Sequence, residues 1–187
     1  MAEKQSTIRR PLIAIPARFS PGATALRYEA EVTARALVVA VFAAGGEPVV
    51  VHPYAPDHEV DVDTARERIW FADGVLLPGG GDVAARWFGQ QPHPTQYGVD
   101  EEQDAFDLAV THVALSDRLP LLAYSVDGVI EAVTLQDHAG WYLGVQWHPE
   151  DSAATDPVQA EVFRHFVDAA AEQMQRPDRR VSASAHV

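Results

Sequence analysis

The chain contains no cysteine, which excludes disulfide bonds, thiolate metal sites and a cysteine nucleophile. Basic residues are scarce: 14 Lys and Arg stand against 27 Asp and Glu, so the formal net charge is −13. This balance argues against a nucleic-acid groove, which needs a basic face, and it disfavours docking on anionic membranes. No apolar run approaches the roughly 20 residues that span a bilayer. We therefore expect neither nucleic acid nor membrane among the partners.

What is present is a chain of 187 residues, 47% of them apolar, which is enough to bury the core of one domain. The first ten residues are polar and show no secretory signal, so we expect a cytoplasmic protein. The predicted domain covers residues 11–175. It lies between a disordered N-terminus over 1–10 and a disordered tail over 176–187 that is rich in Arg, Ser and Ala.

Strand and helix signals alternate along the domain. Short apolar runs bounded by turn residues predict strands at 12–15, 48–51, 74–77, 119–123, 129–133 and 142–146. Helical spacing of apolar residues predicts helices at 26–44, 100–116 and 158–174, and a short helix that Asp63 would cap and that ends at Ile69. This order predicts parallel β-α-β units in a three-layer α/β/α sandwich, with a site beyond the carboxyl ends of the strands.

The first stretch at such a strand end is a run of three glycines, Gly79, Gly80 and Gly81, before Asp82. Glycines let the backbone turn tightly and expose N–H groups that can bind an anion or stabilise an oxyanion. Taken alone, a triple glycine is more often a simple turn after a strand. It is not a phosphate loop, because no Gly-Lys-Ser/Thr follows.

The second stretch holds His148 and Glu150 directly after the last predicted strand. A histidine and an acid two residues apart can form a general base and the carboxylate that orients it. The same residues are equally well explained if His148 is a surface histidine beside Pro149 in a turn. The other histidines show no metal-ligand spacing, so no metal site is expected.

Together the segments resemble the γ-glutamyl-γ-aminobutyrate hydrolase-like branch of the class I glutamine amidotransferases. The resemblance covers roughly residues 11–172, and its most specific part is the Gln-Trp-His-Pro-Glu sequence at 146–150. The other pieces occur in the family's order, at 28–53, 73–80, 104–107, 118–123 and 127–132.

The resemblance implies a flavodoxin-like fold, a Cys-His-Glu triad and no cofactor. His148 matches the family's base and Glu150 its orienting carboxylate, while the loop of Gly79, Gly80 and Gly81 matches the one that binds substrate and faces the oxyanion. His93 matches a loop near the substrate mouth. The implied reaction is hydrolysis of a γ-glutamyl amide through a thioester, and the family's name substrate belongs to polyamine breakdown.

The sequence departs from the family near 123–125. After Ala123 several tens of residues are absent, including the nucleophile and the helix that follows it. A parallel sheet is normally covered on both faces, so a second chain could cover the bared surface, and a homo-oligomer is possible. Either the segment is naturally absent or the printed sequence omits it. Sequencing the gene across the Ala123 and Tyr124 codons distinguishes the two.

Ser125 can be aligned in two ways. Counted directly from Ala123, it falls at the nucleophile position; by its downstream neighbours, which match more residues, it belongs to the late strand. Three hypotheses follow: a γ-glutamyl hydrolase-like protein that is inactive as printed, a non-catalytic module that binds a γ-glutamyl ligand or another subunit, and a serine hydrolase that uses Ser125 and His148. The last is the weakest, because a hydroxyl is a poorer nucleophile than a thiolate and Val126 and Asp127 do not form the usual small-residue elbow.

Overall fold

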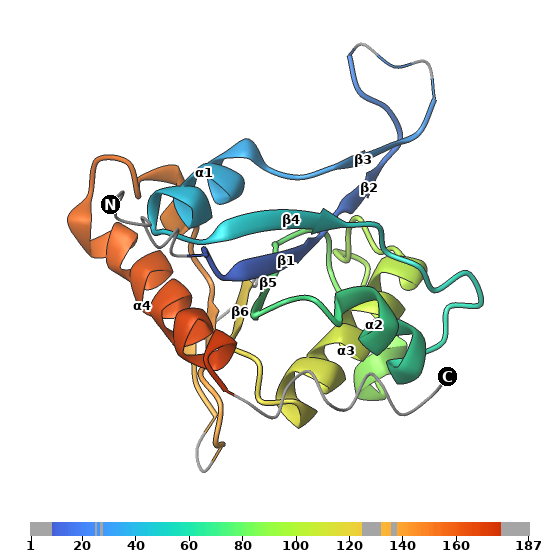
Figure 1. The fold of residues 1–187 in the computed structure, drawn as a ribbon. Coiled ribbons are helices and arrows are strands. Elements are labelled where there is room, and N and C mark those ends of the chain that lie inside the picture. The colour runs from blue at the N-terminus through green and yellow to red at the C-terminus, as the bar shows by residue number, and fades with distance from the viewer. Residues whose placement is uncertain (1–8, 25, 27, 125–131, 136–137, 177–187) are drawn as a thin grey trace, which may run out of the picture.

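The computed structural model describes residues 9–24, 26, 28–124, 132–135 and 138–176. Its centre is a 6-stranded sheet in the order β4-β1-β5-β6-β8-β7, in which only the β7–β8 pair is antiparallel (Figure 1). The strands are β1 (Leu12–Pro16), β4 (Glu47–Val51), β5 (Gly74–Leu77), β6 (Leu121–Tyr124), β7 (Ala132–Val133) and β8 (Tyr142–Val145). The protein is thus of mixed α/β type with a mainly parallel sheet, which is compatible with a flavodoxin-like fold.

The α-helices of the described residues are α1 (Arg35–Ala43), α2 (Val62–Ile69), α3 (Glu101–Ser116) and α4 (Pro157–Met174). The last three begin at an aspartate that accepts backbone N–H bonds: Asp61, Asp100 and Asp156. The predicted cap of α2 was wrong, because Asp63 lies in the first turn and donates its own N–H to Asp61 Oδ1 at 3.1 Å. Its carboxylate there still favours the positive end of the helix dipole.

The predicted helix over 26–44 is wrong in its first half. Residues 30–32 form β3 (Ala30–Val32), which pairs antiparallel with β2 (Arg18–Ser20) in a separate 2-stranded sheet. Of the apolar positions that suggested a helix, only Val32 precedes α1. The backbone of residues 30–32 finds its hydrogen-bond partners on β2, and this tertiary pairing outweighs local helical spacing.

Two clusters of buried side chains join the sheet to the helices. Ile13, Ile15 and Leu76 belong to a cluster with residues of α1 and α4. Their neighbours in the same strands, Ala14 and Val75, belong to the other cluster, with residues of α2 and α3. Successive strand side chains point to opposite faces, so these strands are buried on both sides, which explains their uninterrupted apolar runs.

The crossover from β6 to β8 covers residues 125–141, and its described part contains β7 but no helix. Parallel neighbours are usually joined through a helix that covers the sheet. Here Val133 and Leu135 are 41% and 44% exposed. Residues 129–131 of the predicted fifth strand lie outside the described residues. No helix in the described ranges is long and apolar enough to cross a membrane.

Candidate functional site

The glycine loop, residues 78–82, leaves the carboxyl end of β5 and lies against the segment around Gly98. The N–H of Asp82 donates to Tyr97 O at 2.9 Å, and the N–H of Tyr97 donates to Asp82 Oδ2 at 2.9 Å. A Cβ atom on Gly81 would lie 2.1 Å from Gly98 O, so this position admits only glycine in the observed conformation. Gly81 therefore allows a close approach between the backbone of this loop and that of Gly98.

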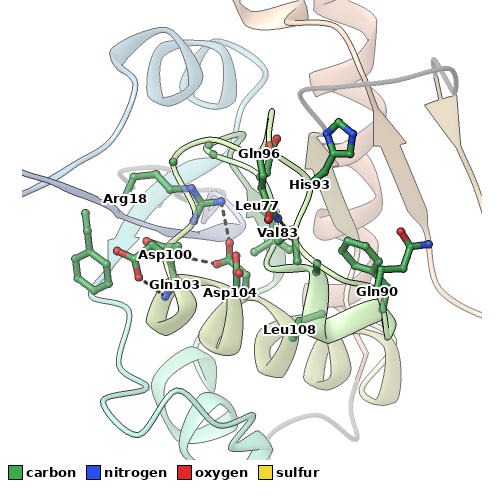
Figure 2. Close-up of a pocket in the computed structure, with 18 of the residues that line it drawn as sticks. Arg18, Leu77, Val83, Gln90, His93, Gln96, Asp100, Gln103, Asp104 and Leu108 are labelled. Carbon is green, nitrogen blue, oxygen red and sulfur yellow. Dashed lines mark hydrogen bonds and ion pairs between the residues drawn. The ribbon is translucent and has the colours of Figure 1, made fainter.

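A pocket of about 660 Å³ opens beside this loop and along α3 (Figure 2). Gly80, Gly81 and His93 line it, whereas Gly79 does not. His93 is held by its own turn, with Nδ1 2.7 Å from Thr95 Oγ1. The acidic, basic and amide side chains that line it are those of Arg18, Asp82, Gln90, Gln91, Gln96, Asp100, Gln103, Asp104 and Asp107. One guanidinium among four carboxylates makes the pocket wall acidic.

The carboxylates of α3 are perturbed by their surroundings. Burial raises the pKa of Asp104, and Asp100 and Glu101 add to the effect, while the hydrogen bond from the Ala84 N–H at 2.8 Å opposes it. Burial also raises the pKa of Asp107, against the opposing charge of Arg18. Both groups thus resist ionisation more than a solvated aspartate does.

Two substitutions at Asp104 distinguish the effect of its charge on stability from the effect of its hydrogen bond with the Ala84 N–H. Because burial raises the pKa of Asp104 in the folded state, ionisation of this group opposes folding. The stability that the neutral carboxyl contributes is complete below the pKa of the unfolded state, near 3.8. It is lost as the pH rises through the pKa of the folded state. Asp104→Asn, which keeps an acceptor for Ala84, is therefore expected to match or exceed wild-type stability at pH 7 and to lose any advantage below pH 3.8. Asp104→Ala leaves that N–H unpaired and should cost about 1–3 kcal/mol. Urea unfolding at both pH values checks this; equal losses in the two variants would contradict it.

His148 and Glu150 form a pair at the carboxyl end of β8. Nδ1 of His148 lies 3.0 Å from Glu150 Oε1, and the side chains are 50% and 8% exposed. The segment is anchored by Trp147, whose Nε1–H donates to Gln159 Oε1 of α4 at 2.8 Å. It then enters a short 3₁₀ helix, η2 (Pro149–Asp151), in which Pro149 is buried. A buried carboxylate beside a half-exposed imidazole can fix the orientation of the ring.

The pair and the glycine loop leave the same edge of the sheet but do not share the pocket, whose lining includes neither His148 nor Glu150. β5 and β8 flank β6, with Leu77, Ala123 and Gly144 at one level across the three strands. The carboxyl end of β6 therefore lies between the glycine loop and the pair. Ser125, the next residue but one after Ala123, lies outside the described residues, so its distance from His148 stays untested.

Sequence reasoning did not assign Arg18, Gln103 or Asp107 to a site, although all three line the pocket. Arg18 follows β1 at the carboxyl edge of the sheet, which is where such folds place their sites. Asp100, Gln103 and Asp107 repeat at helical spacing, so they share one face of α3. These signals were available, but at these positions the arginine, glutamine and aspartate match no recognised catalytic motif. Within the described residues, no three His, Asp or Glu side chains are grouped to hold a metal ion.

The chain matches the model of a family described as Peptidase C26. The match comprises two segments, residues 11–126 and 122–150, which overlap at the carboxyl end of β6 and both include Ser125. No curated protein matches the chain. The segments together cover well over half of the sequence, so the chain belongs to the Peptidase C26 family, a glutamine amidotransferase-like family that includes γ-glutamyl hydrolases.

Proposed function

We propose that this protein binds a γ-glutamyl compound in a site of the γ-glutamyl hydrolase type and does not hydrolyse it. One observation carries the proposal: Nδ1 of His148 lies 3.0 Å from Glu150 Oε1 in a chain without cysteine. This is the arrangement of a general base and the carboxylate that orients it. Glu150 engages Nδ1, which leaves Nε2 for proton transfer. Without a cysteine, this base has no thiol to activate and the thioester of the γ-glutamyl hydrolases cannot form.

The finer assignments are part of the same proposal. We assign the chain to the γ-glutamyl-γ-aminobutyrate hydrolase-like branch and its ligand to the small γ-glutamyl compounds. We also propose the three-layer α/β/α arrangement, which the two core clusters on alternate residues of β1 support. A second copy of the chain is the proposed cover for the sheet near β7, where Val133 and Leu135 are exposed.

Calorimetry with γ-glutamyl-γ-aminobutyrate, together with an assay for released amine, tests the proposed function. We expect heat of binding for the γ-glutamyl compound, none for γ-aminobutyrate alone, and no ammonia or amine above buffer from this compound or from glutamine. Absence of binding would contradict the ligand assignment. Release by the wild-type chain would contradict the loss of hydrolysis, provided that it is absent in His148→Ala.

A serine hydrolase is the second candidate. It is supported by the place of β6 between the glycine loop and the pair, and by the inclusion of Ser125 in both segments of the family match. Amine release abolished by both Ser125→Ala and His148→Ala would establish it. Release that survives Ser125→Ala would exclude Ser125 as nucleophile.

A further inference from the structure

We propose that Arg18 is a positioning residue that sets the orientation of the Gly79 and Gly80 N–H groups. Arg18 begins β2, and its guanidinium reaches two successive carbonyl groups of the glycine loop. Its Nε donates to Gly79 O at 3.2 Å, and its Nη2 donates to Pro78 O. Few side chains can fix two adjacent peptide groups at once; the rigid fork of arginine can.

Peptide geometry carries the next step. In a planar trans peptide the C=O of one residue and the N–H of the next point in opposite directions. Because Arg18 draws the carbonyls of Pro78 and Gly79 toward itself, the N–H groups of Gly79 and Gly80 point away from it. Within the described residues, neither N–H has a hydrogen-bond partner. The loop thus presents two donors for an anion or a carbonyl oxygen, and Arg18 determines their direction.

The guanidinium is itself held in place from α3. Nη2 of Arg18 lies 2.9 Å from Asp107 Oδ2, with side-chain exposures of 18% and 21%. Gln103 supports the carboxylate, because its Nε2 donates to Asp107 Oδ1 at 3.3 Å. Figure 2 shows Arg18 extending toward the carboxylates of α3. A link therefore runs from α3 through Asp107 and Arg18 to the loop.

The fit between arginine and loop is close. A Cβ atom on Gly80 would lie 3.2 Å from Arg18 Nε, so the loop passes directly over the guanidinium. The remaining nitrogen, Nη1, is buried without a hydrogen-bond partner in the described part of the chain. Burial of an unpaired donor is costly, and three-point fixing of the other nitrogens offsets that cost. The guanidinium is therefore held in one position, although one of its nitrogens lacks a hydrogen-bond partner among the described residues.

Amide ¹H–¹⁵N spectra of the full chain test the orientation directly. Arg18→Ala is expected to shift the resonances of Gly79 and Gly80 more than those of any glycine outside the loop. Arg10→Ala is the matched control, since Arg10 also donates to two backbone carbonyls, Phe42 O and Gly46 O. In that variant the Gly79 and Gly80 resonances should stay in place. If Arg18→Ala leaves them unmoved as well, the proposal is wrong.

Arg18→Lys separates orientation from charge. Lysine keeps the positive charge opposite Asp107 but lacks the fork that reaches both carbonyls. We expect it to regain much of the stability lost in Arg18→Ala while the glycine resonances remain displaced. If lysine restores the resonances to their wild-type positions, Arg18 acts only as a charge and the positioning role is overturned.

The consequence for the ligand rests on the proposed function. Affinity for γ-glutamyl-γ-aminobutyrate should fall about tenfold in both Arg18→Ala and Arg18→Lys, and remain unchanged in Arg10→Ala. If the wild-type chain binds nothing, the proposed function fails while the spectra still decide the role of Arg18. If binding is intact in all variants although the resonances move, the two N–H groups are not ligand donors.

Discussion

Replacing Gly81 with alanine is expected to lower the free energy of unfolding by about 3 kcal/mol, at the upper end of what overpacking costs. The added Cβ would lie 2.1, 2.4 and 2.8 Å from the O, C and Cα atoms of Gly98. All three are backbone atoms, which cannot swing aside as a flexible side chain can. The loop is also tied to the same segment by the two hydrogen bonds between Asp82 and Tyr97, so relieving the clash breaks them. Urea unfolding gives the loss.

Gly22→Ala is the control for adding a methyl group where no neighbouring atom obstructs it. A Cβ on Gly22 meets no atom within 4 Å, and its backbone does not adopt a positive φ. Its stability should therefore stay within about 0.5 kcal/mol of wild type, or rise slightly through reduced unfolded-state entropy. If Gly81→Ala unfolds at the same urea concentration as Gly22→Ala, the close approach of Gly81 and Gly98 does not constrain the loop.

The sequence predicted best those elements whose burial is uniform along the chain. β5 has the predicted ends, because its four residues are all buried and lie between Asp73 and Pro78. α3 and α4 follow their apolar spacing to the last residue, and an aspartate marks the start of each. In these segments the local preference and the tertiary environment favour the same structure.

The prediction failed where pairing with a distant segment decides the structure. β2 and β3 have three residues each, and neither is stable without the other. The same reason applies to the pocket: Arg18 and Asp107 meet only because β2 and α3 face the same loop. His148 and Glu150, in contrast, are only two residues apart, so their contact depends on local structure and the sequence could predict it. Their catalytic role stays a prediction.

Phe166→Ala is expected to lower the free energy of unfolding by about 3–5 kcal/mol. Phe166 is completely buried, and its ring lies 5.6 Å from that of Trp141. It also packs against the first residue of β5: a Cβ on Gly74 would lie 3.3 Å from Phe166 Cε2. Glycine at position 74 thus makes room for this ring between α4 and the sheet. Because domains of this kind are stable by only about 5–15 kcal/mol, the variant should be partly unfolded in mild denaturant.

Phe42→Ala is the matched control, because the same atoms are removed from a side chain that is 53% exposed. Its ring contacts the Arg10 guanidinium, 4.0 Å from the ring centre, which is worth about 0.5–1 kcal/mol at an exposed site. The difference between the two urea midpoints therefore measures the packing of the Phe166 ring against Trp141 and β5. If the two losses are equal, α4 does not hold the strand from which the glycine loop departs, and the pocket must be supported from α3 alone.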